Sequence, residues 1–248
     1  MSEETSTPTE QPHATFLREL HDSCSTSLEN SLNGGNGIEM GKAHGFAGDI
    51  AAWNAVLASR PESFLLQISE EEYIAALVNV AQGQYRNAFK ALRLVLELQL
   101  QAVHLSANLI ERSEWLASSQ DTIWRKLVDH DLGPLSKRFS RAFFPGLEEH
   151  VANFRAMAET LYRELSETIH GNVPNHIPLP TSFTFDANAF KLWHEKASTT
   201  RTIVVFALSS RYLHEISEAD RESIRDVVSD ELGHIKPIRA LFGGPTES

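Results

Sequence analysis

The sequence predicts an all-α protein, and three observations lead to that fold class. Apolar residues recur at steps of three and four along most of the chain, which is the spacing of one face of an α-helix. One segment, TIVVFALSSRYL at 202–213, is β-branched enough for a strand, but no second segment is available to pair with it. Hydrophobic residues make up 42% of the 248 positions, which is enough to bury a core. We therefore expect a helical bundle.

Residues 1–45 are predicted to form a flexible acidic arm in front of this bundle. The stretches MSEETSTPTEQPH and NSLNGGNGIEMGKAHG are rich in Ser, Thr, Pro, Asn and Gly, and they frame only a short apolar patch. Such a composition favours disorder over a packed helix. The arm is acidic because residues 1–33 hold six carboxylates and a single arginine, Arg18.

The first predicted helices follow this arm. Apolar residues at steps of three and four predict one amphipathic helix over 46–57, which ends before the Arg60-Pro61 pair. Ser69 precedes three glutamates, as expected for an N-cap, and begins a helical region that reaches about Leu109. Gly83 is predicted to divide this region in two.

The second half of the chain alternates irregular and helical segments. Short helices and a loop at Gly133-Pro134 are expected over 112–148, and a long amphipathic helix over 151–169 is expected to end at Gly171. The prolines of VPNHIPLPTSF predict an extended connection after it. Helices are then expected over 187–215 and around 224–232.

Composition excludes several classes of protein. The formal net charge is −11 and the pI is about 5.5, so the field of the whole surface does not attract nucleic acid and any such contact must be local. Cys24 is the only cysteine, which excludes an intramolecular disulfide and favours a reducing compartment. Neither a signal peptide nor a run of about 18 apolar residues is visible. We expect a cytoplasmic protein without membrane association.

Catalytic signatures of the common enzyme classes are absent from the sequence. There is no Gly-x-Ser-x-Gly, no phosphate-binding loop and no Gly-x-Gly-x-x-Gly. His194 and His214 each precede a glutamate, but neither has the second histidine four residues on that a zinc-binding helix needs. We expect neither a metal nor a cofactor.

The segment YRELSETIHGNVPN at 162–175 holds the main candidate site, Arg163 and His170. Seven residues turn a helix by about 700°, so both side chains leave one face, roughly 10 Å apart along the axis. Two interpretations are open. In the first, the face is solvated: Arg163 pairs with Glu159 and Glu167, and His170 lies at the negative end of the helix dipole. In the second, the face is a functional site.

The Arg-x6-His spacing at a helix end resembles the Arg-x4-6-His motif of the HEPN superfamily. FKALRLVLELQLQAVHLSANLIERSEWL resembles the long early helix of HEPN-like bacterial proteins, and YRELSETIHGN resembles their motif-bearing helix. The resemblance covers residues 69–215. It implies a compact all-α domain over 46–243 that forms a homodimer, and members of the superfamily include metal-independent endoribonucleases of toxin and phage-defence systems.

The resemblance also implies roles for individual residues. In a site formed across the homodimer, Arg163 would hold the RNA phosphate and His170 would transfer protons. An antitoxin or a defence-system protein is a possible partner. Glu164 stands where active members usually have Asn, Asp or His, and we place it among the supporting residues of the site.

Two further groups of residues are candidates for supporting roles. Arg93 and Glu97 form an i,i+4 pair. Either the two form a salt bridge at the rim of the core, or one of them reaches the motif helix and orients Arg163 or His170. The basic stretch from 124 to 144 is interleaved with aromatic residues and either binds RNA or forms a solvated loop. Its candidate RNA-binding residues are Arg125, Lys126, Lys137, Arg138 and Arg141.

Two functions therefore remain open at the level of the sequence. One is a metal-independent endoribonuclease that cleaves RNA by attack of the 2′-hydroxyl. The alternative is a non-catalytic HEPN-like helical module that binds a partner protein or a small ligand. Sequence-specific DNA binding is not expected, because no helix-turn-helix with a basic recognition helix is visible.

Overall fold

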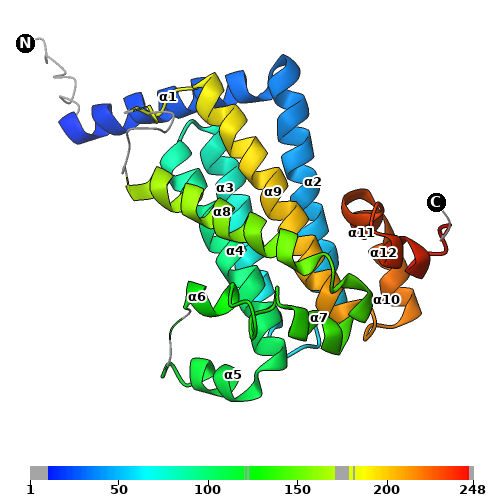
Figure 1. Cartoon of the computed structure of the whole chain (residues 1–248). Helices are drawn as coiled ribbons and strands as arrows, with labels where there is room; N and C mark the ends of the chain where they lie inside the picture. The colour runs from blue at the N-terminus through cyan, green and yellow to red at the C-terminus, as the bar shows by residue number, and fades with distance from the viewer. Residues whose placement is uncertain (1–10, 120, 122, 171–178, 181, 246–248) are drawn as a thin grey trace, which may run out of the picture.

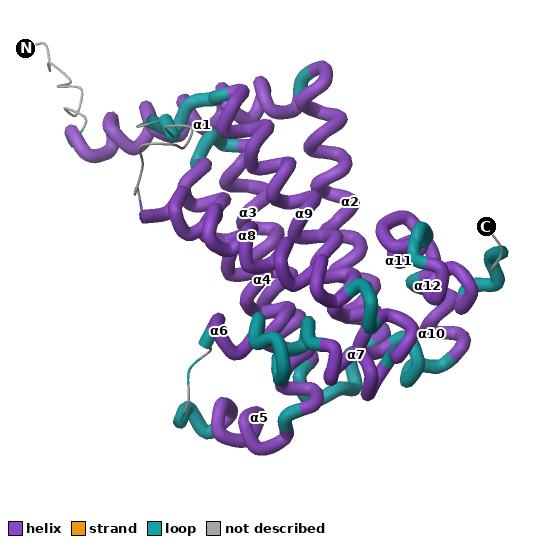
Figure 2. Tube along the Cα trace, viewed as in Figure 1, coloured by secondary structure: helices purple, strands orange, loops and turns teal. Residues whose placement is uncertain are grey.

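The structure, a computed structural model, describes residues 11–119, 121, 123–170, 179–180 and 182–245. These residues form twelve α-helices and one short 3-10 helix, and none of them lies in a strand (Figures 1 and 2). The prediction of an all-α fold is confirmed. The segment that could have been a strand on composition alone lies in the last helical turns of α9.

Four long helices form the centre of the molecule: α2 (Gly34–Val56), α3 (Ser63–Ala81), α4 (Tyr85–Ala107) and α9 (Ala187–Tyr212). The α3–α4 hairpin has the most extensive contact, α2 packs on α3 and α9, and α4 packs on α9. A fifth long helix, α8 (Val151–His170), packs against α4 and α9 and crosses them at an angle (Figure 1).

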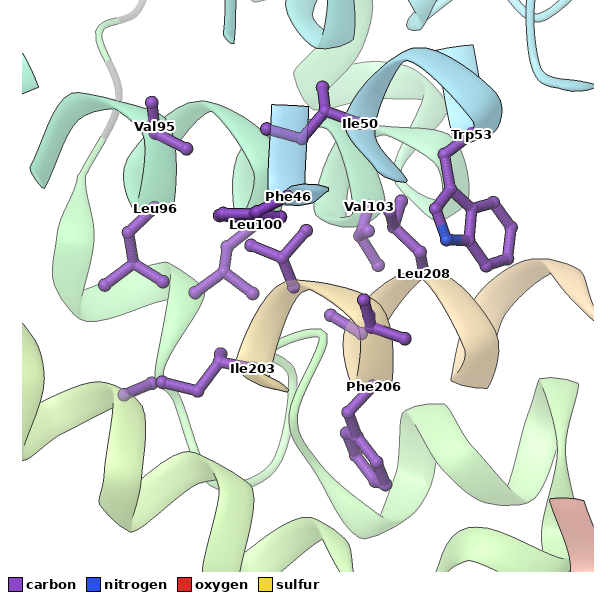
Figure 3. Packing of buried hydrophobic residues seen from close by; sticks show 14 of the residues in the cluster. Phe46, Ile50, Trp53, Val95, Leu96, Leu100, Val103, Ile203, Phe206 and Leu208 are labelled. Carbon is purple, nitrogen blue, oxygen red and sulfur yellow. The ribbon is translucent and has the colours of Figure 1, made fainter. Parts of the chain in front are cut away.

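The core lies where α2, α4 and α9 meet (Figure 3). Trp53 from α2, Leu100 from α4 and Phe206 from α9 are all at most 1% exposed. α8 joins this core through Phe154, whose ring stacks on that of Phe206 with the centroids 3.7 Å apart. Burial of this apolar area, worth roughly 25 cal/mol per Å², fixes the relative positions of the long helices.

Shorter helices lie at and beside the lower end of the bundle in Figure 1, opposite the end that α1 crosses. α5, α6, α7 and η1 connect α4 to α8, while α10, α11 and α12 follow α9, with α11 packed on it. Their bounds are α5 Leu109–Leu116, α6 Trp124–Leu127, α7 Lys137–Phe143, η1 Pro145–Leu147, α10 Glu218–Ser223, α11 Arg225–Leu232 and α12 Lys236–Leu241.

The predicted flexible arm is largely helical, which corrects the sequence-based expectation for residues 12–45. α1 (Pro12–Leu32) and the first half of α2 occupy this stretch, and residues 1–10 lie outside the described residues. α1 is attached by small polar side chains: Ser31 Oγ donates to the Ala81 carbonyl at 3.0 Å and Ser27 Oγ to the Phe183 carbonyl at 3.3 Å. An apolar stripe is therefore not what holds it. A domain boundary at residue 45 would also fall inside α2.

The predicted helix boundaries agree with the structure at most points. Gly83 divides the long region as expected, with φ +74° between α3 and α4. Ser69, however, is not an N-cap, because α3 begins at Ser63. Ser69 is buried in the middle of α3, where its hydroxyl accepts a hydrogen bond from Gln99 Nε2 at 3.0 Å and links α3 to α4.

Candidate functional site

α8 carries the Arg163–His170 segment and buries the apolar face that the sequence predicted. Every third or fourth residue from Val151 is buried, whereas Arg163 on the other side is exposed. The buried residues of this face are Val151, Phe154, Ala158, Leu161 and Leu165. The amphipathic pattern thus directs Arg163 away from the core.

Arg163 forms no ion pair with any residue that the structure describes. The interpretation in which Glu159 and Glu167 neutralise it is therefore not what the structure has. His170 is the last residue of α8, but its side chain lies outside the described part, as do Gly171, Asn172 and His176. The position of the imidazole relative to the guanidinium stays a prediction.

A charged and aromatic cluster lies beside Arg163, where α4 contacts α8. Arg93 Nε and Nη2 both donate to Glu97 Oε1 at 3.2 Å, and Nη2 also donates to the Tyr162 hydroxyl at 2.5 Å. The guanidinium lies over the Tyr162 ring, 4.5 Å from its centroid. Arg93 thus crosses to the motif helix, but it reaches Tyr162 rather than Arg163.

The environment of Tyr162 keeps its phenol protonated. Burial is the main cause that raises the pKa of Tyr162, and the hydrogen-bonded Glu97 carboxylate raises it further. The side chains of Arg93 and Glu97 are only 25% and 21% exposed, so this ion pair is stronger than one on an open surface. The cluster fixes α8 against α4 directly before Arg163.

α6 extends the cluster with a stacked aromatic ring. Trp124 lies parallel to Tyr162, with the ring centroids 3.9 Å apart and an interplanar angle of 7°. The next residue, Arg125, is exposed, whereas Lys126 is half-buried and donates to Glu111 at 2.9 Å. Of the predicted RNA-binding residues, Arg125 is thus exposed and directly follows the tryptophan that stacks on Tyr162.

The other predicted RNA-binding residues lie at a different part of the molecule. Lys137, Arg138 and Arg141 are exposed on α7, which precedes the start of α8, and Arg141 is paired with Glu148 at 2.6 Å. From Val151 to Arg163 the helix rises by about 18 Å. The five cations therefore lie on two separate helices, Arg125 and Lys126 on α6 and the other three on α7.

Glu164 faces α9 and has a structural partner there. Its carboxylate accepts a hydrogen bond from Lys196 Nζ at 2.6 Å, and the two side chains are 34% and 21% exposed. This contact ties α8 to α9. Glu164 is thus engaged on the side of α8 next to the core, away from the Arg93–Glu97–Tyr162 cluster.

Tyr162 and Trp124 are the members of the cluster that sequence reasoning missed. Tyr162 directly precedes Arg163, and an aromatic residue between the apolar and polar faces of a helix commonly contacts a neighbouring helix. Trp124 begins the basic stretch that was predicted to bind RNA. Both signals were present, but the pairing across 38 positions of the chain depends on the fold.

Comparisons with models of known protein families, with curated proteins and with solved structures find no match. Within the described residues, no group of three or more His, Cys, Asp or Glu side chains is arranged to hold a metal ion. None of the described helices is long and apolar enough to span a bilayer.

Proposed function

We propose that this protein is a HEPN-like, metal-independent endoribonuclease that acts at the exposed face of α8. The observation that carries the proposal is the exposed guanidinium of Arg163, without an ionic partner among the described residues, beside the fixed Arg93–Glu97–Tyr162 cluster. An exposed guanidinium that is left without a carboxylate is available for a phosphate.

The chemistry assigned to the pair is an internal transesterification of RNA. The ribose 2′-oxygen attacks the adjacent phosphorus and loses its proton, while the bond to the 5′-oxygen breaks and that oxygen gains a proton. Arg163 donates hydrogen bonds to the phosphate oxygens as their charge increases, and His170 transfers protons because imidazole titrates near neutral pH. The products are a 2′,3′-cyclic phosphate and a 5′-hydroxyl.

Neighbouring residues have supporting roles in this proposal. The cluster around Tyr162 keeps α8 in position against α4, so the backbone that carries Arg163 is held in place. Trp124 adds an aromatic ring stacked on Tyr162, and the next residue, Arg125, adds an exposed cation; this pair suits the backbone and bases of single-stranded RNA. The site is completed across a homodimer, and a toxin or phage-defence role with a partner protein that restrains the activity fits a nuclease of this type.

The test is cleavage of a labelled single-stranded RNA by the purified protein in the presence of EDTA. His170→Ala and Arg163→Ala are each expected to lower the cleavage rate by at least 100-fold, because each removes a group that acts in the transition state. Product ends should carry a 2′,3′-cyclic phosphate.

Two matched controls lie on or next to the same helix. Arg155→Ala and His150→Ala remove the same side-chain types at least two turns from Arg163, and both should cleave at the wild-type rate. Thermal melting of all four variants checks that they fold. Wild-type protein that leaves RNA intact, or cleavage that survives both His170→Ala and Arg163→Ala, would refute the proposal.

A further inference from the structure

A cavity of about 770 Å³ lies between α2 and α9, on elements that the proposed nuclease site does not use. Its lining comes from α2, from Tyr73 of α3 and from residues 187–201 of α9, and includes nothing from α4, α6 or α8. Cavities of roughly 300–1,000 Å³ are typical of small-molecule sites. The volume therefore suits a drug-sized ligand.

The floor of the cavity is apolar and aromatic. Phe46 and Tyr73 contact each other edge to face with the ring centroids 4.6 Å apart, and Phe190 contributes a third ring. The Tyr73 hydroxyl is already used, since it donates to the Ala43 carbonyl at 2.9 Å. These side chains are buried, with exposed fractions of at most 2% for the three rings. The floor favours a ligand with ring-shaped apolar surface.

The charged side chains around the cavity have their own counter-ions. Lys42 Nζ lies 2.7 Å from Glu39, and Lys191 Nζ lies 3.8 Å from Glu195. Arg201, deeper in the wall, pairs with Asp49 of α2 at 2.5 Å and with Glu231 of α11 at 3.0 Å. Because none of these charges lacks a partner, the wall offers no specific attraction to an ionic ligand. Moving an ion into such a site would cost desolvation energy.

His194 is the exception among the polar residues of this wall. It is 7% exposed, it lines the cavity, and neither Nδ1 nor Nε2 has a hydrogen-bond partner among the described residues. Its ring packs on Phe190, with the centroids 4.2 Å apart. Burial lowers the pKa of His194 to about 4, so the imidazole is neutral at neutral pH. A neutral imidazole offers one donor and one acceptor, and a buried polar group without a partner is unfavourable.

We infer that this cavity binds a neutral, largely apolar ring compound whose hydroxyl or amide group hydrogen-bonds to His194. The ring surface packs on the aromatic floor. Both nitrogens of His194 are buried in the structure, so the imidazole turns to bring one of them to the cavity, where the single polar group satisfies it. This inference is independent of the proposed nuclease activity.

The test measures binding of three probes of the same shape by ligand-observed NMR and calorimetry at pH 7. 2-Naphthol carries a neutral hydroxyl, 2-methylnaphthalene has no hydrogen-bonding group, and 2-naphthoate is an anion. Wild-type protein should bind 2-naphthol about tenfold more tightly than 2-methylnaphthalene, as expected for one hydrogen bond to a buried group, and should bind 2-naphthoate weakest.

Variants locate the binding and separate the contributions. His194→Phe should lower the affinity for 2-naphthol about tenfold and leave 2-methylnaphthalene unchanged. Ser198→Trp places a bulky ring at an exposed position of the lining and should weaken both, while Ala152→Trp, at an exposed position on α8, should change neither.

Three results would overturn the inference: absence of binding by every probe, equal affinity of the wild type for 2-naphthol and 2-methylnaphthalene, or tightest binding of the anion. The wild-type ratio decides the matter even where His194→Phe does not fold. RNA cleavage by Ser198→Trp should equal that of the wild type, so a failure here is distinguishable from a failure of the nuclease proposal.

Discussion

Two aromatic polar side chains, Tyr162 and His194, show how different surroundings give residues different roles. Arg93 donates a hydrogen bond to the Tyr162 hydroxyl, which fixes its position, and burial together with Glu97 raises the pKa of Tyr162, which keeps the hydroxyl protonated. His194 is more deeply buried and has no polar partner among the described residues. An unsatisfied buried polar group costs roughly 1–3 kcal/mol. Tyr162 thus stabilises the helix contact, whereas His194 lowers stability at a place where a ligand would restore it.

The neutral state of His194 predicts a pH dependence of stability. Its pKa is about 4 in the folded protein and about 6.5 in the unfolded chain, so the unfolded chain takes up the proton first as pH falls. The free energy of unfolding is unaffected by this titration above about pH 6.5 and falls as the pH is lowered from 6.5 to 4, because only the unfolded chain gains the proton in that range. The loss should be of order 2–3 kcal/mol by pH 4.

Urea denaturation of the wild type and of His194→Phe at pH 7, 5.5 and 4.5 measures this effect. The variant cannot titrate at this position, so its free energy of unfolding should fall less than that of the wild type over the same range. The nearby charged groups Glu39, Lys42, Lys191 and Glu195 are present in both proteins. Parallel pH profiles for the two proteins would contradict the assignment.

At the scale of elements, amphipathic helices were predictable and helices attached by small polar residues were not. α4 and α8 follow from apolar spacing and from the Gly83 division, whereas residues 203–212 of α9 are buried all round and were assigned to a helix because no second strand was available to pair with them. α1 and the start of α2 were predicted to be disordered because their composition is low in apolar residues. Tertiary contacts hold them instead: serine hydroxyls attach α1, and Phe46, Ile50 and Trp53 anchor α2 in the core.

Two glycines should respond in opposite ways to substitution by alanine. Gly83 has φ +74°, and a Cβ there would lie 2.8 Å from the Thr184 carbonyl oxygen, so Gly83→Ala should destabilise the protein by at least about 1–2 kcal/mol. Gly48 lies inside α2 with open space around its Cα, so Gly48→Ala should stabilise it by about 0.5–1 kcal/mol.

Urea midpoints of the two variants, with unchanged slopes, give both values. Shifts of the same sign would mean either that the α3–α4 turn can relax or that α2 is not a stable helix at Gly48. The pair of variants therefore checks that the stretch around Gly48 is a stable helix.

At the scale of the whole molecule, both sites combine segments that are distant in the sequence. Arg93, Trp124 and Tyr162 come from three helices. Sequence spacing linked either Arg93 or Glu97 to the motif helix that carries Tyr162, but nothing in it placed Trp124 beside that helix. The cavity combines α2 with residues 73 and 187–201, and all five of its lining residues from α2 fall in the predicted arm or at its border. Spacing rules act within one element, so they cannot foresee such combinations.

The proposed homodimer should be visible in the molar mass of the protein. Size-exclusion chromatography with light scattering should give twice the chain mass of 27.7 kDa. The α3–α4 hairpin exposes Ile68, Ile74, Val78 and Leu94, with exposed fractions between 36% and 51%. Ile74 and Val78 lie one turn apart on α3, and if a second copy covers them, Ile74→Glu should shift the mass towards one chain.

The matched control is Ile110→Glu on α5, a separate helix that follows the C-terminal end of α4, where the isoleucine is 76% exposed. It should leave the dimer intact. A wild-type mass of one chain would remove the dimer from the proposal, and dissociation by Ile110→Glu alone would move the interface to α5.

The two walls of the cavity differ in how firmly the backbone is held. Six of the chain's 13 glycines lie in α2, all of them in the part of the helix from Gly34 to Gly48 that forms one wall, whereas α9 has none and is packed on α4 and α8. Each glycine weakens a helix by roughly 0.5–1 kcal/mol relative to alanine. We therefore expect local opening to begin in α2, so a molecule bound in the cavity should slow amide exchange in that helix.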